Sequence, residues 1–347
     1  MQRILLIKLT SLGDLIHALP ALSDARAAYP DIEFDWVVDE NFQEIATWHP
    51  AVKNVFTTNH RKWREYLAHP STYGEIYRLS KEMRRSSYDL IIDGQGNFKS
   101  ALVALLAKGK RAGFDKDSVR EKVAAFAYQQ THAVSKKAHA IERLRLLFGG
   151  ALNYTPSGPP DFQIDQSRFV PPPIELPDSY LVFVHNATWQ TKLWPESHWR
   201  TLIQKAVGAG YTILLPWGNL EEKARAERLA ISSQVQVLPK LSLSQVGYVL
   251  ARAKACVSMD TGLSHLSAAL NISSITLYGS TDSGLIGASG KGQVHLKSTL
   301  PCSPCNKKKC PLYASGPPCH ALAQITPDAV FQRLLPMLTT SVPSRLD

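Results

Sequence analysis

Strand-like runs and helix-like segments alternate along most of this 347-residue chain. The apolar run 3–8 is followed by a turn-like stretch at 10–14 and then by residues 15–22, whose apolar positions have helical spacing. Further strand-like runs lie at 34–38, 52–56, 90–93 and 111–114, and helix-like segments such as 100–107 and 140–148 separate them. Repeated β-then-α units predict a parallel sheet covered by helices.

A proline-rich stretch interrupts this alternation. Seven prolines fall between Tyr154 and Pro177, which is typical of a linker between domains. The pattern restarts at 180–185 and predicts a second α/β domain of similar size. We therefore predict an N-terminal domain over 1–160, a linker over 161–177, a C-terminal domain over 178–326 and a terminal helix within 327–347.

The net charge of +10 is concentrated in one part of the chain. Residues 1–50 carry 3 Lys and Arg against 8 Asp and Glu, whereas residues 51–150 carry 19 against 9. Such an excess favours an acidic partner, which can be a nucleic acid, a membrane surface or a phosphorylated substrate. No nucleic-acid recognition motif accompanies the charge, so we expect no nucleic-acid partner.

No apolar run reaches the roughly 18 residues that a membrane-spanning helix needs. The apolar N-terminal run is interrupted by Lys8 and Asp14, unlike the core of a signal peptide. We therefore expect a cytoplasmic protein, in which disulfides are unlikely among the five cysteines.

Ligands of open parallel sheets bind at the carboxyl ends of the strands, so polar stretches after predicted strands are the candidate site residues. The first stretch is Thr10–Asp14, whose backbone N–H groups can meet an anion at the start of a helix. Asp14 is either a functional carboxylate or the N-cap of an ordinary helix. The stretch is neither a Walker loop nor a dinucleotide-binding glycine motif.

Two further stretches lie in the second half. Residues 185–195 combine hydroxyls with Lys192 and suit a phosphate group, although an ordinary polar loop is an equal alternative. In the stretch Asp260–His265, donors at a helix start favour a diphosphate. A single Asp-Thr-Gly in an α/β context excludes an aspartic protease, which needs two copies in β-rich lobes.

Two clusters have less specific patterns. Arg61, Lys62 and Arg64 lie in the basic block, where charge runs are usually solvated faces. Four cysteines are spaced compactly enough for one tetrahedral metal site, or else form a loop of reduced thiols; they are Cys302, Cys305, Cys310 and Cys319. The fifth, Cys256, is expected to be a small core residue.

Four motifs of this chain resemble motifs of the ADP-heptose:lipopolysaccharide heptosyltransferases of glycosyltransferase family 9, and they occur in the same order. They are Lys8–Asp14, Lys192–Pro195, Leu215–Gly218 and Asp260–His265. The chain resembles this family from residue 2 to about residue 287, and its type I members most closely.

The resemblance implies a GT-B fold, in which two Rossmann-like domains face each other across a cleft. The donor would be held mainly by the C-terminal domain, and the terminal helix would cross back to the first. It implies inverting transfer of L-glycero-D-manno-heptose from ADP-heptose to a Kdo residue of Kdo2-lipid A, with no metal required. We expect a monomer that works as a peripheral protein on the cytoplasmic face of the inner membrane.

The resemblance also assigns roles to residues. Asp14 would be the catalytic base, and the basic residues with Ser11 would bind the acceptor: Ser11, Arg61, Lys62 and Arg64. The donor-binding positions are Ala187, Thr188, Lys192, Glu222, Leu241, Asp260, Thr261, Gly262 and His265. Ala187 replaces a threonine common in the family, which removes a hydrogen bond worth about 1 kcal/mol.

Several alternatives stay open. Cysteine-rich tails occur in other heptosyltransferases, including iron-binding ones that modify proteins, so a structural Zn or Fe ion is possible at the four cysteines. The acceptor can also be an already heptosylated lipid or a protein. A sugar-nucleotide epimerase of similar fold is the alternative from another enzyme class.

Overall fold

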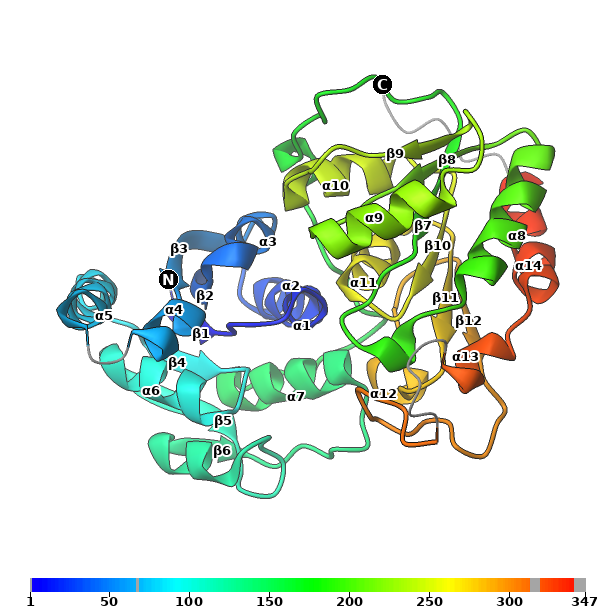
Figure 1. Cartoon of the computed structure of the whole chain (residues 1–347). Coiled ribbons are helices and arrows are strands. Elements are labelled where there is room, and N and C mark those ends of the chain that lie inside the picture. Colours follow the sequence, from blue (N-terminus) through cyan, green and yellow to red (C-terminus); the bar gives the residue numbers. More distant parts are fainter. Residues whose placement is uncertain (1, 67–68, 313–318, 340–347) are drawn as a thin grey trace. The chain divides into compact units, whose positions relative to one another are not determined.

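The computed structural model describes residues 2–66, 69–312 and 319–339. The chain divides into two compact units, Met1–Asp165 and Gln166–Asp347. The division falls inside the segment predicted as a linker. Each unit contains one six-stranded sheet in which every pairing is parallel. The predicted α/β architecture is therefore confirmed (Figure 1).

The first sheet has the strand order β3-β2-β1-β4-β5-β6. Its strands are β1 (Arg3–Ile7), β2 (Glu33–Asp39), β3 (Val52–Thr58), β4 (Leu90–Asp93), β5 (Lys110–Phe114) and β6 (Gln130–His132). Its helices are α1 (Leu12–Ile16), α2 (Leu19–Ala28), α3 (Gln43–Thr47), α4 (His60–Glu65), α5 (Pro70–Met83), α6 (Phe98–Leu106) and α7 (Ala140–Leu152), with the 3₁₀ turns η1 (Glu40–Phe42) and η2 (Lys122–Ala127). The strand order reverses between β1 and β4, which is where open α/β sheets bind ligands.

The second sheet repeats this arrangement in the order β12-β11-β10-β7-β8-β9. Its strands are β7 (Tyr180–Val184), β8 (Thr212–Leu215), β9 (Val235–Val237), β10 (Ala255–Met259), β11 (Ser274–Tyr278) and β12 (Gln293–Lys297). Its helices are α8 (Glu196–Gly208), α9 (Leu220–Leu229), α10 (Leu243–Ala251), α11 (Gly262–Ala269), α12 (Ser283–Ile286), α13 (His320–Ala323) and α14 (Pro327–Thr339), with the 3₁₀ turns η3 (Gln166–Arg168) and η4 (Gln190–Lys192). Here the order reverses between β7 and β10.

Helices cover both faces of the second sheet, with α8 and α14 on one side and α10 and α11 on the other (Figure 1). The central strands β7 and β10 are buried along their whole length, which explains their continuous apolar sequences. Cys256 on β10 is fully buried, as predicted for a core residue.

The C-terminal helix α14 packs within its own unit. Val330, Leu334 and Leu338 on its buried face join the core formed with α8 and the second sheet. The expectation that the segment from 327 crosses to the first unit stays a prediction, and residues 340–347 lie outside the described part. Within the described residues, no helix is both long and apolar enough to cross a membrane.

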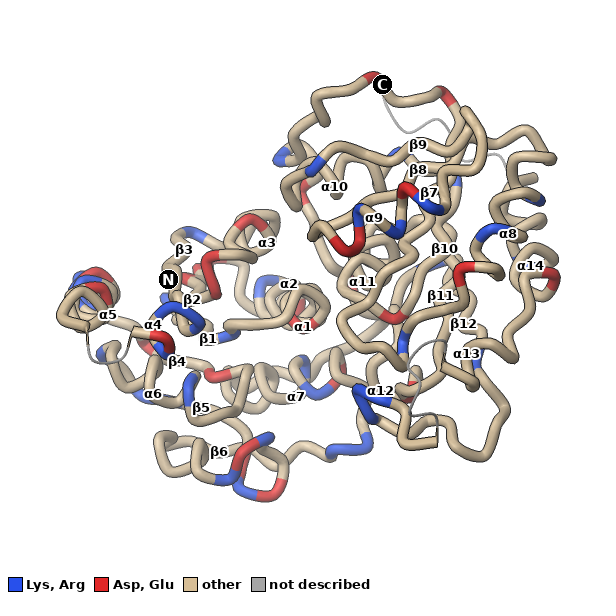
Figure 2. The backbone as a smooth tube through the Cα atoms, viewed as in Figure 1, with Lys and Arg blue, Asp and Glu red and all other residues tan. Residues whose placement is uncertain are grey.

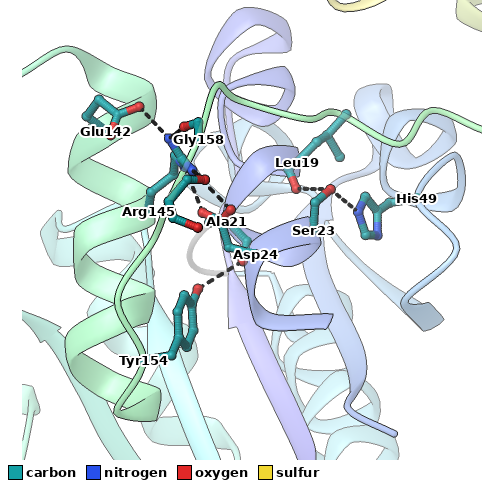
Figure 3. A network of polar contacts seen from close by, with 10 residues as sticks. Leu19, Ala21, Ser23, Asp24, His49, Glu142, Arg145, Tyr154 and Gly158 are labelled. Carbon is teal, nitrogen blue, oxygen red and sulfur yellow. Dashed lines mark hydrogen bonds and ion pairs between the residues drawn. The ribbon is translucent and has the colours of Figure 1, made fainter. Parts of the chain in front are cut away.

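A buried ion pair joins two helices of the first unit. Arg145 on α7 is only 3% exposed and donates through Nε to the Asp24 carboxylate on α2 at 2.7 Å (Figure 3). The same guanidinium also donates to Glu142 and to the carbonyl oxygens of Ser157 and Gly158. These contacts satisfy a buried cation and fix α7 against α2.

Asp24→Ala is expected to lower the free energy of unfolding by about 3 kcal/mol, the lower end for a broken buried pair, because the buried Arg145 charge loses one carboxylate and keeps the more exposed Glu142. Urea unfolding measures the change. Asp328→Ala is the matched control, since Asp328 is 73% exposed and pairs with Lys205 on the surface; its effect should stay below about 1 kcal/mol. Equal effects of the two substitutions would contradict this assignment.

Candidate active-site residues of the two units

Asp14 lies in the first turn of α1, directly after the first strand. Ser11 is the N-cap, and Asp14 is the third helical residue, which completes a capping box by accepting from the backbone N–H of Ser11. The predicted capping role is therefore present, at the third helical position and not at the N-cap itself. Both the backbone N–H and the hydroxyl of Ser11 donate to Oδ2 of Asp14, at 2.8 and 3.0 Å. With Oδ2 held in this way, the half-buried carboxylate has a fixed orientation, and its Oδ1 is the oxygen suited to receive a proton from a bound hydroxyl.

The loop after β4 is hydrogen-bonded to the loop that carries Asp14. The side-chain oxygen of Gln95 accepts hydrogen bonds from the backbone N–H groups of Leu9 and Thr10, at 3.1 and 3.3 Å. Asp93 in turn accepts from the backbone N–H groups of Gln95 and Gly96. Two loops more than 80 residues apart are therefore joined at the carboxyl ends of the adjacent strands β1 and β4.

Two buried charged groups lie beneath these loops. Lys8 is 7% exposed and donates through Nζ to the carbonyl oxygen of Gly94 at 3.1 Å. Burial lowers the pKa of Lys8, while the negative charges of Asp14 and Asp93 oppose that shift. Burial raises the pKa of Asp93, which is fully buried and also accepts from the Tyr128 hydroxyl. The Lys8 side chain is therefore fixed to the loop after β4, beneath the loop that carries Asp14.

Gln95 and Asp93 were not among the candidate site residues predicted from the sequence. A signal was present, because Asp93-Gly94-Gln95-Gly96 is a polar stretch after a predicted strand. The strand order, in which β4 lies next to β1, could not be predicted from the sequence pattern.

The three basic residues predicted to bind an acceptor lie on α4. Arg61 and Arg64 are exposed, whereas Lys62 forms an ion pair with Glu75 on α5 at 2.6 Å. Between them Trp63 is buried and donates through its indole N–H to the same Glu75. The cluster is therefore anchored to α5 and is better ordered than a freely solvated charge run.

In the second unit, Asp260 follows β10 and is 3% exposed. Its Oδ2 contacts Lys192 Nζ at 2.6 Å and accepts from the Thr281 hydroxyl at 2.5 Å. Its Oδ1 lies 3.7 Å from Nε2 of His265. Burial raises the pKa of Asp260, but the polar contact with His265 and the positive charge of Lys192 outweigh it and lower the pKa well below its usual value. Asp260 is thus a fixed anion that orients Lys192.

Lys192 comes from the loop after β7, which is the strand paired with β10. Its ammonium group also lies 4.8 Å from the centre of the Trp189 ring, and its side chain is only 15% exposed. Next to it α11 begins at Gly262 with Thr261 as N-cap. A lysine and the positive end of a helix together favour a phosphate or diphosphate group.

The other predicted donor residues lie in loops at the same edge of the second sheet. Ala187 and the exposed Thr188 follow β7, while Leu241 precedes α10. Glu222 on α9 accepts from the backbone N–H of Gly218 at 2.7 Å and so supports the turn after β8. The structure brings Lys192, Asp260 and His265 into contact. It places the other four residues after β7, on α9 and before α10, without joining them to that cluster.

Thr281 was not selected from the sequence. Its hydroxyl contacts Asp260 because β11 pairs with β10, so the loops that follow the two strands are adjacent. The stretch Gly279-Ser280-Thr281 after a predicted strand was the available signal.

The cysteine segment gives no support for a metal site. In the parts of the chain that the structure describes, no three His, Cys, Asp or Glu side chains are grouped as a metal would require. Residues 313–318, between the third and fourth cysteines of the motif, lie outside those parts. The pKa of the buried Cys319 thiol is raised, mainly by burial and also by Cys310 and Cys305. The four-cysteine site stays a prediction.

The sequence model of the protein family described as glycosyltransferase family 9 (heptosyltransferase) matches residues 76–314 of this chain. The lipopolysaccharide heptosyltransferase 1 of Pseudomonas aeruginosa is 46% identical to it over 312 residues, which are 89% of this chain and 87% of the relative.

Solved structures give a similar result. The Escherichia coli heptosyltransferase WaaC with ADP has a TM-score of 0.85 and 40% identity, and the match covers 97% of this chain and 100% of that one. The same enzyme with ADP-2-deoxy-2-fluoro heptose has a TM-score of 0.83 and 39% identity, over 96% of this chain and 99% of that one.

Proposed function

Since this chain belongs to glycosyltransferase family 9, the heptosyltransferases, we propose that it transfers L-glycero-D-manno-heptose from ADP-heptose to a Kdo residue of Kdo2-lipid A, in lipopolysaccharide inner-core biosynthesis. The fold is the GT-B type of these enzymes. In this chain, the feature that best supports the proposal is the buried ion pair between Lys192 and Asp260 beside the start of α11. The pair fixes the orientation of a cation that a diphosphate would contact.

The donor site is proposed for the loops of the second unit. Lys192, the start of α11 at Thr261 and Gly262, and His265 would hold the diphosphate. Asp260 would orient Lys192 and the heptose. Glu222 would accept hydrogen bonds from the ribose and Leu241 would contact the adenine, with Ala187 and Thr188 beside the phosphates.

The chemistry needs a base and a stabilised leaving group. The acceptor hydroxyl would attack the anomeric carbon of heptose while the bond from that carbon to the diphosphate oxygen breaks, which inverts the configuration. Asp14 of the first unit would take the hydroxyl proton. Lys192 and the positive end of α11 in the second unit would offset the charge that develops on the departing ADP. No cofactor is needed for these steps.

Release of ADP distinguishes this proposal from a sugar-nucleotide epimerase. A transferase forms ADP and heptosylated acceptor in equal amounts and leaves ADP-heptose unchanged when no acceptor is present. An epimerase converts the donor by itself. Conversion of ADP-heptose to an isomer in the absence of acceptor would contradict the proposal.

The acceptor is proposed to meet the first unit. Ser11 lies beside Asp14, and Arg61, Lys62 and Arg64 would contact the anionic groups of the lipid. A cytoplasmic, peripheral membrane location follows from such an acceptor, and one copy of the chain would suffice for the reaction. Because exposed charges are screened by salt, the acceptor KM should rise with ionic strength; a KM independent of salt would argue against these contacts.

Gln95→Ala is expected to lower kcat at least about tenfold, because the loop that positions Asp14 loses two hydrogen bonds. Donor affinity, measured by calorimetry with ADP, should not change. Gln129→Ala is the matched control, since Gln129 also accepts from a backbone N–H group in the first unit, that of Arg111. If both variants kept full turnover, Gln95 would have no positioning role.

A structural Zn or Fe ion at Cys302, Cys305, Cys310 and Cys319 is proposed separately from catalysis. Elemental analysis of protein purified without chelator should find close to one ion per chain. A content below about 0.1 ion per chain would remove the idea.

A further inference from the structure

The outward face of α6 is apolar. Phe98, Leu102 and Leu105 follow one another at spacings of four and three residues, so they lie in one row along the helix. They are 50%, 47% and 45% exposed, whereas Val103 and Ala104 on the other side are buried. A helix on a protein surface normally presents polar residues to water. The exposed row of α6 therefore lacks the polar residues that solvent favours.

Two more exposed apolar side chains lie on the neighbouring 3₁₀ turn η2. Val123 is 52% exposed, and Phe126 at 90% is the most exposed large apolar side chain in the described part of the chain. The turn packs against α6. In addition, the carboxylate of Glu121, just before η2, accepts from the backbone N–H of Phe98 at 2.9 Å. We call the surface of Phe98, Leu102, Leu105, Val123 and Phe126 the α6–η2 face.

The segment that carries the α6–η2 face contains more basic than acidic residues (Figure 2). Residues 98–127 contain 7 Lys and Arg against 3 Asp and Glu, a net charge of +4. The exposed cations of this segment are Lys99, Lys108, Lys110, Lys116, Arg120 and Lys122. At the far end of α6, Arg84 from α5 donates to the carbonyl oxygen of Leu106 at 2.7 Å and adds another exposed cation.

The α6–η2 face begins close to the residues proposed to bind the acceptor. The pKa of His60, the first residue of α4, is lowered mainly by burial and next by the charge of Lys99 on α6. Trp63 on α4 and Val103 and Ala104 on α6 also belong to one apolar core, so the two helices pack on the same part of this unit. Arg61 and Arg64 on α4 and the apolar row of α6 therefore lie on neighbouring elements of one unit.

We propose that the α6–η2 face rests on an anionic lipid bilayer. Its apolar side chains would enter the boundary between headgroups and acyl chains, and the surrounding lysines and arginines would contact lipid phosphates. Exposed apolar residues together with several cations are the composition that interfacial binding to anionic membranes requires. This inference rests on the proposed function in one respect only, which is that membrane docking would bring the enzyme to its lipid acceptor.

The charge pattern favours a bilayer over a second copy of the chain. A symmetric dimer through the α6–η2 face would bring the same set of cations together on both sides. Like charges at close range oppose that association, whereas anionic headgroups are complementary to them.

Sedimentation with lipid vesicles tests the proposal, without donor or acceptor. The full chain should bind vesicles of phosphatidylcholine mixed with phosphatidylglycerol more tightly than vesicles of phosphatidylcholine alone. The double variant Leu102→Gln, Phe126→Ser should lower the partition coefficient for the mixed vesicles at least about tenfold. Leu220→Gln is the matched control, since Leu220 is an exposed leucine of the second unit, at 78%, and should bind like the parent chain.

A gain of signal provides a second readout. In Phe126→Trp, the added indole should shift its emission to shorter wavelength when mixed vesicles are added. Unchanged vesicle binding by the double variant, or no shift in Phe126→Trp, would overturn the proposal. A double variant that changes only the oligomeric state in gel filtration would identify a protein interface instead and would also overturn it.

Turnover separates this inference from the proposed function. With a Kdo acceptor freed of its acyl chains, the double variant should keep the turnover of the parent chain. If the parent chain shows no transfer but binds vesicles as described, the proposed function fails and the membrane-binding face stands.

Discussion

Asp14→Ala is expected to lower the rate of heptose transfer by between about 10²-fold and 10⁴-fold, the range that a general base contributes. The Ser11 hydrogen bonds hold one oxygen of the carboxylate, so the other is available to a substrate hydroxyl. Asp14→Asn should lose as much activity, because it keeps the shape and removes the basic oxygen. Calorimetry with ADP should show unchanged binding, since the donor residues lie in the other unit.

Asp115→Asn is the control for this experiment. Asp115 also follows a strand of the first sheet, and it accepts from the backbone N–H of Ser118 at 2.8 Å. Its replacement should leave turnover within about twofold of the parent chain, the spread expected of surface substitutions. Full turnover by either Asp14 variant would exclude Asp14 as the base.

Lys192→Ala is expected to lower kcat by about 10²-fold to 10³-fold, which is the usual effect of losing one group that stabilises developing charge. Affinity for ADP should fall as well, because the same ammonium would contact the bound diphosphate. Steady-state kinetics and calorimetry measure the two effects separately. Lys205→Ala is the control, since Lys205 pairs with the exposed Asp328 and should change neither quantity.

The same substitution should change the pH dependence of stability. Asp260 has a lowered pKa in the folded chain, so its ionised form contributes stability above about pH 4, and this contribution is lost as the pH falls. Without Lys192, the folded-state pKa rises and the contribution shrinks. Urea unfolding should therefore show the largest loss near neutral pH and a smaller loss at acidic pH, where Asp260 of the variant takes up a proton before Asp260 of the parent chain does. A loss that is constant with pH would contradict the role of the pair.

The alternation of strands and helices could be predicted because each element has its own apolar pattern. The candidate residues at strand ends could be predicted for a related reason, since parallel strands bring their carboxyl ends to one edge. Asp14, Lys192 and Asp260 all follow that rule. The contact between Lys192 and Asp260 depends in addition on the pairing of β7 with β10. Paired residues of these strands, such as Leu181 and Ala255, are 74 positions apart in the sequence, so no local pattern predicts the pairing.

The residues that sequence reasoning missed depend on the same long-range order. Gln95 contacts the Asp14 loop only because β4 lies beside β1, and Thr281 contacts Asp260 only because β11 lies beside β10. The exposed row of α6 could not be recognised either. Its sequence is apolar on most sides, so the outward face becomes known only when the packing of α6 is known.

The identity of the acceptor tests the central claim most directly. The purified chain is incubated with ADP-heptose and either Kdo2-lipid A or the same lipid already carrying one heptose, and mass spectrometry follows both products. We expect one heptose to be added to Kdo2-lipid A, with equal release of ADP, and no addition to the heptosylated lipid. Addition to the heptosylated lipid alone, or no addition to either, would contradict the proposed function.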